Sequence, residues 1–123
     1  MIELSTLPKT WLIDIDGTLF RHNGHLSGKD DLLPGALEFI RSIALSDHIV
    51  LLTARGPEHE ELTHQSLQSA GIRYDKILFG LPSGERILIN DTKPSGLQTA
   101  HAVNLERDAG LAEVGGLIRI VDM

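Results

Sequence analysis

The stretch Trp11-Leu12-Ile13-Asp14-Ile15-Asp16-Gly17-Thr18-Leu19 begins as an apolar run and ends with two carboxylates separated by one residue. The apolar run predicts a buried β-strand at residues 12–15. Alternate residues of a strand point to the same side, so Asp14 and Asp16 should lie together at its carboxyl end, where open α/β sheets bind ligands. Gly17 permits the tight turn that follows. Such a pair suits a hard cation such as Mg²⁺, although Asp and Gly are also common in solvated turns.

Helix-like and strand-like segments alternate beyond this stretch. Pro34 and Gly35 begin a segment whose apolar residues recur at helical spacing. The run 49–52 predicts a central parallel strand covered on both faces. Pro57 suits the first turn of a second helix and Gly71 its end. Further strands are predicted at residues 76–79, 86–89, 99–104 and 117–121. We therefore expect an α/β fold with a Rossmann-like, doubly wound parallel sheet in three layers.

Composition narrows the class of protein. A chain of 123 residues with 41% hydrophobic and 23% charged residues fits one soluble domain, spanning residues 1–123. No apolar run is long enough to cross a bilayer, and residues 1–5 lack the pattern of a signal peptide, so a cytoplasmic location without membrane contact is expected. The chain has no cysteine, which excludes disulfides and thiolate metal sites. A net charge of −6 argues against a broad nucleic-acid surface.

The segment Asp14-Ile15-Asp16-Gly17-Thr18 resembles the opening motif Asp-x-Asp-Gly-Thr of the haloacid dehalogenase-like (HAD) phosphohydrolases. The resemblance covers residues 12–104 and implies a Mg²⁺-dependent phosphatase that acts through an aspartyl-phosphate. It implies that Asp14 attacks the phosphorus, and that Asp16 protonates the leaving oxygen and later activates water. Apart from the resemblance, covalent catalysis by a carboxylate is reasonable on physical grounds, because it divides one difficult phosphoryl displacement into two easier ones.

The second motif of this family is matched at Thr53, at the end of an apolar run. The resemblance implies that the Thr53 hydroxyl and nearby backbone amides, at Ala54 and beyond, bind the transferring phosphoryl group. Donors of this kind stabilise negative charge because they are already aimed at it. Arg55 is a candidate for substrate binding, and the alternative is a solvent-exposed arginine in the loop.

Asn90 and Asp91 occupy the place of the family's acidic fourth motif. The resemblance implies a Mg²⁺ ion held by Asp14, the backbone carbonyl of Asp16 and Asp91, with water and phosphate completing the shell. Asn90 could orient water or a ligand, or could only satisfy hydrogen bonds in a turn.

The third motif is where the chain departs from the family. Small phosphatase-like relatives carry Gly-Lys-Pro where this chain has Gly80-Leu81-Pro82, so the expected phosphate-binding lysine is missing. Arg86, Lys93 and Lys76 are the nearby replacements. Arg86 begins the strand that leads to the fourth motif, whereas Lys93 follows that motif directly, and the choice between these two stays open.

The six histidines form no zinc pattern, and the simplest expectation is that they are solvated surface residues. His22, His25 and Arg21 follow Asp16 closely and could border the site. The segments 18–34 and 53–91 are too short for the cap domain that many family members insert. An open site could admit a large phosphorylated substrate, or another subunit could cover it.

The leading hypothesis is therefore a capless HAD-like phosphomonoester hydrolase, which could act on a sugar phosphate, another phosphorylated metabolite or a carrier-linked phosphoester. The alternative, which the missing lysine favours, is a non-catalytic or weakly active domain that binds phosphate or metal and regulates a partner. A phosphorylatable receiver domain is disfavoured, since its acidic pair and its phosphorylated aspartate should follow different strands.

Overall fold

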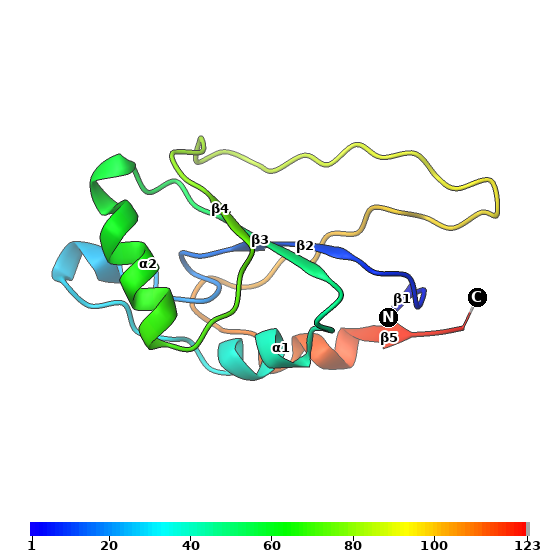
Figure 1. Cartoon of the computed structure of the whole chain (residues 1–123), viewed down its shortest axis with the longest axis horizontal. Coiled ribbons are helices and arrows are strands. Elements are labelled where there is room, and N and C mark those ends of the chain that lie inside the picture. The colour runs from blue at the N-terminus through cyan, green and yellow to red at the C-terminus, as the bar shows by residue number, and fades with distance from the viewer. Residues whose placement is uncertain (123) are drawn as a thin grey trace.

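A three-stranded parallel sheet forms the centre of the computed structural model, which describes residues 1–122 (Figure 1). Its strands are β2 (Thr10–Asp14), β3 (His48–Leu52) and β4 (Lys76–Leu78), in the order β2-β3-β4. Asp14 pairs with Leu52, and Leu52 pairs with Leu78, so the carboxyl ends of all three strands meet at one edge. The first three predicted strands are confirmed.

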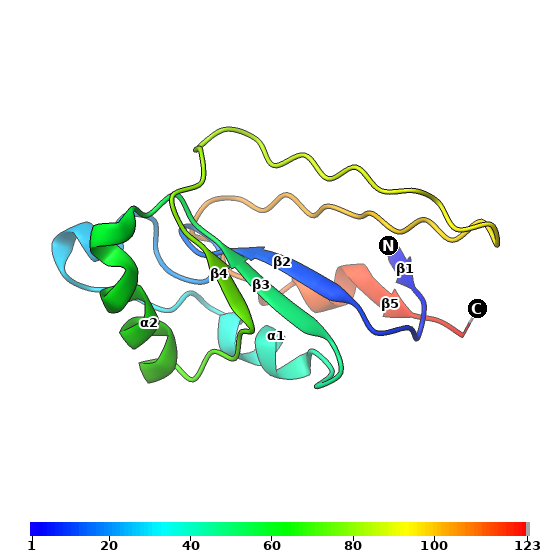
Figure 2. The same ribbon diagram turned by 45° about the horizontal axis from the view of Figure 1, so that its top comes forward.

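Two helices connect these strands. Helix α1 (Ala36–Ser42) links β2 to β3, and a 3-10 turn (Pro57–His59) followed by helix α2 (Glu60–Ser69) links β3 to β4. Because right-handed crossovers between successive neighbouring strands place their helices on the same face, both helices lie on one side of the sheet (Figure 2). No helix within residues 1–122 is both long and apolar enough to cross a bilayer.

The core lies between this sheet and the two helices. Alternate residues of β2 and β3 enter it together with residues from both helices: Ile13, Ile49, Leu51, Ala36, Ile40 and Leu67 are all buried. The opposite face of the sheet is more open, with 48% of Leu12 and 39% of Leu78 exposed. In the described part of the chain the sheet is therefore covered by helices on one face, where the sequence predicted both.

A second, two-stranded sheet joins the beginning and the end of the described chain. Strand β1 (Ile2–Leu4) runs parallel to β5 (Ile118–Ile120), and Glu3 forms an ion pair with Arg119. The predicted strand at 117–121 is thus confirmed, whereas β1 was not predicted. The architecture is α/β with parallel strands in two small sheets.

Residues 80–104 form a long extended loop beyond β4, which we call the excursion. The loop reverses direction at a turn over Lys93–Leu97 (Figures 1 and 2). No strand is present at 86–89 or 99–104, so these two predictions were wrong. Ile87 is 79% and Ile89 is 88% exposed. The physical reason is that a strand requires a hydrogen-bonded neighbour, and an apolar run reveals nothing about which neighbour it meets.

Candidate active site

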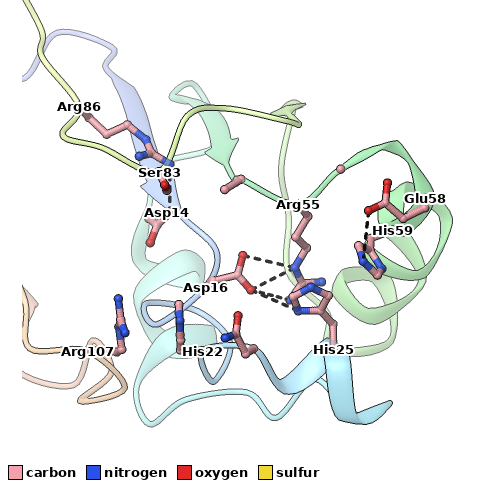
Figure 3. A pocket seen from close by; sticks show the side chains of 13 residues that line it. Asp14, Asp16, His22, His25, Arg55, Glu58, His59, Ser83, Arg86 and Arg107 are labelled. Atoms are coloured by element: carbon pink, nitrogen blue, oxygen red, sulfur yellow. Dashed lines mark hydrogen bonds and ion pairs between the residues drawn. The ribbon is translucent and has the colours of Figure 1, made fainter.

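A pocket of about 400 Å³ lies at the carboxyl ends of the central strands (Figure 3). Four segments line it: the end of β2 with the loop that follows, the β3–α2 connection, the start of the excursion, and Arg107 near the end of the chain. Asp14 and Asp16 both face it, which confirms the prediction that the two carboxylates share one side. Pockets of this size hold small-molecule ligands.

The turn after Asp16 determines how the two carboxylates are presented. Gly17 adopts a φ of 84°, a left-handed conformation that glycine reaches without strain. The carbonyl of Ile15 accepts hydrogen bonds from the backbone amides of Leu19 and Phe20, each at 3.0 Å. The chain therefore reverses tightly at this point, as the motif predicted.

Asp14 is the more accessible of the two carboxylates, with 45% of its side chain exposed. Burial raises the pKa of Asp14 above its ordinary value, while the Arg86 guanidinium opposes this shift and Asp16 adds to it. The nearest nitrogen of Arg86 lies 3.8 Å from Asp14 Oδ1. Asp14 is thus a carboxylate that a pocket ligand can reach, with one cation beside it.

Asp16 is held by Arg55. Arg55 Nε and Nη2 donate to Asp16 Oδ1 at 3.1 and 2.9 Å, and Nη1 and Nη2 donate to the two oxygens of Asp30 at 3.0 and 2.8 Å. Only 1% of the Arg55 side chain and 2% of the Asp30 side chain are exposed. Planar guanidinium groups suit such two-sided pairing with carboxylates. Arg55 is buried, so the alternative of a solvent-exposed arginine was wrong. It lines the pocket with its charge paired to two carboxylates, and its role in substrate binding stays a prediction.

Charge pairing decides the protonation of this buried cluster. Burial by itself would raise the pKa of Asp30, but the Arg55 hydrogen bonds and charge outweigh it and hold that pKa below its usual value. Burial likewise disfavours the Arg55 cation, and its hydrogen bonds to Asp30 and Asp16 nevertheless raise its pKa. Asp30 and Arg55 are therefore both charged at neutral pH.

Thr53 contributes to the same arrangement. Its side chain is fully buried, its hydroxyl donates to Asp16 Oδ2 at 2.9 Å, and it accepts from the backbone amide of Arg55 at 3.0 Å. The Thr53 hydroxyl thus positions Asp16, and its predicted role in binding a phosphoryl group stays a prediction. Ala54 lines the pocket.

The remaining predicted residues are divided between the pocket and the excursion. Arg86 lines the pocket, whereas Lys93 is exposed at the turn of the excursion and does not. Asn90 and Asp91 are exposed and also lie outside the pocket lining. The Asn90 side chain donates to Thr99 Oγ1 at 3.0 Å, which agrees with the turn-satisfying alternative.

The predicted Mg²⁺ ligand set does not assemble. Asp91 fails to join Asp14 and Asp16, because the strand that should carry it to the sheet edge is not formed. Among residues 1–122, no three Asp, Glu, His or Cys side chains gather in a way that could hold a metal ion. Asp14 suits a hard cation, but the Asp16 carboxylate is engaged by Arg55 and Thr53.

His25 corrects the expectation of solvated histidines. Only 8% of its side chain is exposed, and its ring packs edge-on against His59 at a centroid distance of 4.7 Å. Its buried Nδ1 has no hydrogen-bond partner within the described chain and lies 3.8 Å from Asp16 Oδ1. Burial and the charge of Arg55 lower the pKa of His25. His22 also lines the pocket, as considered from the sequence, and Arg21 does not.

Sequence reasoning missed Asp30 and Arg107. Asp30 lies in a polar loop beside Asp31, and no spacing or motif distinguishes the two acids. Arg107 is far from every motif in the chain and reaches the pocket only through tertiary contacts.

Comparison with known proteins identifies no relative of this chain. No protein-family model matches the chain, and no curated protein or solved structure matches it either.

Proposed function

We propose that the protein is a HAD-like phosphomonoester hydrolase in which Asp14 is the nucleophile. The observation that supports this proposal most directly is the accessible Asp14 carboxylate, which shares one pocket with a fixed Asp16 carboxylate and the Arg86 guanidinium. The resemblance of residues 14–18 to the Asp-x-Asp-Gly-Thr motif supplies the reaction class.

In the first step of the proposed reaction, an Asp14 oxygen forms a bond to phosphorus and the bond from phosphorus to the leaving oxygen breaks. In the second step, water attacks the aspartyl-phosphate and releases inorganic phosphate. Asp16 transfers the proton in both steps, first to the leaving oxygen and then from the water. Thr53 and Arg55 keep its carboxylate in a fixed orientation, which favours proton transfer because geometry governs that step.

Arg86 is proposed to take the place of the missing lysine. It lies beside Asp14, so its charge offsets the repulsion between the Asp14 carboxylate and an approaching phosphate dianion. A preorganised cation at such a position is worth several kcal/mol of transition-state stabilisation, of the order of 3 kcal/mol for a single donor. Lys93 is the less favourable candidate, because it lies outside the pocket lining.

The proposal includes two further expectations, a three-layer sheet and a requirement for Mg²⁺. A three-layer, doubly wound sheet would require residues 86–89 to pair with the free side of β2, which is an edge strand, and helices to cover the second face of the sheet. Dependence on Mg²⁺ stays a prediction of the HAD resemblance. The substrate class is a phosphorylated metabolite such as a sugar phosphate, or a carrier-linked phosphoester, since the pocket is open.

The test is phosphate release from a panel of phosphomonoesters, with Mg²⁺ and with a chelator, by wild type and by Asp14→Asn. We expect release that Asp14→Asn abolishes, and the chelator tests the Mg²⁺ requirement that the HAD resemblance implies. Asp31→Asn is the matched control, because Asp31 is also 45% exposed but lies outside the pocket lining. Release that survives Asp14→Asn would contradict the proposed nucleophile.

A non-catalytic phosphate-binding domain is the second candidate. The separation of Asp91 from Asp14 favours it, because a complete acidic set is what the phosphatase motif implies. Binding of inorganic phosphate by wild type, without turnover of any ester in the panel, would support this candidate instead.

A further inference from the structure

Arg107 differs from the other two arginines of the pocket in having no acidic partner. Arg55 is neutralised by Asp16 and Asp30, and Arg86 lies 3.8 Å from Asp14. Within residues 1–122, Arg107 forms no ion pair and its side chain makes no hydrogen bond, although it lines the same pocket. Figure 3 shows it standing beside His22, with its guanidinium directed toward Asp14. Among the arginines that line the pocket, Arg107 is thus the one that forms no ion pair within residues 1–122.

Asp108 fixes the backbone from which Arg107 extends. The Asp108 carboxylate accepts a hydrogen bond from the His22 amide at 2.7 Å, and the Asp108 amide donates to the Gly17 carbonyl at 2.9 Å. Asp108 adopts a left-handed φ of 64°, an uncommon conformation for a residue with a side chain, which persists where surrounding contacts require it. These contacts connect Asp108 to the turn after Asp16, and His22 and Asp108 are 86 residues apart in the chain.

Gly110 and Leu111, which follow Asp108, attach the same segment to Pro34. The Leu111 amide donates to the Pro34 carbonyl at 2.8 Å, and the Leu111 side chain is buried in the core. Gly110 lies so close to Pro34 that a Cβ at this position would collide with the Pro34 carbonyl oxygen. The stem of Arg107 also packs against Gly17, whose own Cβ would meet Arg107 Cγ at 3.3 Å. Arg107 is therefore presented to the pocket by a fixed backbone.

We propose that Arg107 selects substrates by binding a second anionic group, a carboxylate on the leaving part of the phosphomonoester. This inference rests on the proposed function, because it assumes that the transferred phosphoryl group lies between Asp14 and Arg86. Those two residues leave Arg107 free for another part of the ligand. A pocket of about 400 Å³ has room beyond a phosphoryl group. The substrate class is consequently a small phosphorylated acid.

The carboxylate assignment follows from the geometry of the guanidinium group. Arginine presents paired N–H donors that match the two oxygens of a carboxylate. A neutral hydroxyl at the same position would leave the charge unmatched and would gain one ordinary hydrogen bond. A hydrogen bond between two charged groups is stronger than one to a neutral group, so a preference of about tenfold or more is expected.

The experiment compares two esters that differ mainly in one group, 3-phosphoglycerate with its carboxylate and glycerol 3-phosphate with a hydroxyl. Binding is measured by titration calorimetry on the full chain carrying Asp14→Asn, so that neither ester is consumed. Arg107→Gln, Arg107→Lys and Arg41→Gln are then added singly to this background. Arg41→Gln is the matched control, because Arg41 is exposed on α1 outside the pocket lining.

We expect the parent protein to bind 3-phosphoglycerate about tenfold more tightly than glycerol 3-phosphate. Arg107→Gln should remove this preference by weakening 3-phosphoglycerate alone, Arg107→Lys should keep part of it, and Arg41→Gln should leave it unchanged. Equal weakening of both esters would overturn the inference by placing Arg107 on the transferred phosphoryl group. An unaltered preference, or no binding of either ester to the parent, would overturn it as well. Phosphate release by wild type separately tests the proposed function.

Discussion

The cluster around Arg55 and the excursion at residues 80–104 reverse the usual relation between polarity and burial. The Arg55 and Asp30 side chains are charged and almost fully buried, whereas Ile87 and Ile89 are apolar and lie almost fully in solvent. Each charge in the cluster has a partner of opposite sign within 3.1 Å, while the two isoleucines have no neighbouring strand. Partners, more than polarity, decide what this chain buries.

The strongest test of this comparison removes the central partner. Arg55→Met should lower the free energy of unfolding by about 3–5 kcal/mol, because the Asp30 carboxylate would remain buried without a counter-charge. Chemical denaturation of wild type and variant measures the difference. Arg41→Gln, which removes an exposed arginine, should change stability by less than about 0.5 kcal/mol. A loss below about 1 kcal/mol in Arg55→Met would show that the cluster is not important for stability.

Removal of one acid from the cluster should have a smaller effect that depends on pH. Asp30→Asn should lower stability at neutral pH by about 2–3 kcal/mol, since Arg55 keeps only Asp16. The folded protein lowers the pKa of Asp30, so this stabilisation is present above the unfolded pKa of 3.8 and is lost as pH falls through the folded pKa. Unfolding curves of wild type and variant should therefore converge in acid. A difference that does not change with pH would contradict charge pairing as its source.

Substitution of Arg86 tests the accessible part of the pocket, around Asp14. Arg86→Gln should reduce kcat/KM for a phosphomonoester by about tenfold or more, because a cation beside the transferred group is lost. It should also raise the pKa of Asp14 further, because burial and Asp16 raise that pKa and Arg86 opposes them. The nucleophile must be ionised, so the acid limb of the pH–rate profile should move to higher pH. Movement to lower pH would exclude Arg86 as the neighbour that controls Asp14.

The excursion should be insensitive to loss of its apolar side chains. The double substitution Ile87→Ser and Ile89→Ser should change the free energy of unfolding by less than about 0.5 kcal/mol, because both side chains are already in water. Ile13→Ala, in the core, should cost about 2–5 kcal/mol in the same denaturation measurement. A cost above about 1.5 kcal/mol for the excursion pair would indicate that residues 86–89 pack against the sheet, as the three-layer proposal requires.

The smallest effect is expected at Asp91. Asp91→Asn should alter kcat/KM by less than about twofold, because the residue is exposed and lies outside the pocket lining. Steady-state kinetics at several Mg²⁺ concentrations measure this change, with Asp14→Asn as the reference for a complete loss. A hundredfold decrease that excess Mg²⁺ partly restores would instead place Asp91 at the metal, as the HAD resemblance implies.

Local sequence patterns correctly predicted the part of the fold in which elements that follow one another in the chain also pack together. The apolar runs that end at Asp14, Leu52 and Leu78 form the three strands of the central sheet, and Gly71, with a φ of 76°, ends the second helix as predicted. The shared face of Asp14 and Asp16 was predictable too, because strand alternation is a local property. The run at 86–89 failed since the same pattern occurs whether or not a neighbouring strand is present.

The sequence by itself determined an α/β chain with parallel strands and a pair of carboxylates at the end of one of them, because periodicity and turn chemistry act over a few residues. Only the tertiary structure decided that Arg55 joins Asp16 to Asp30, that Arg86 and not Lys93 enters the pocket, and that Asp108 brings Arg107 to the same place. These contacts join residues that are far apart in the chain. Which of several similar charges meet depends on the path of the whole backbone, and no local spacing records that path.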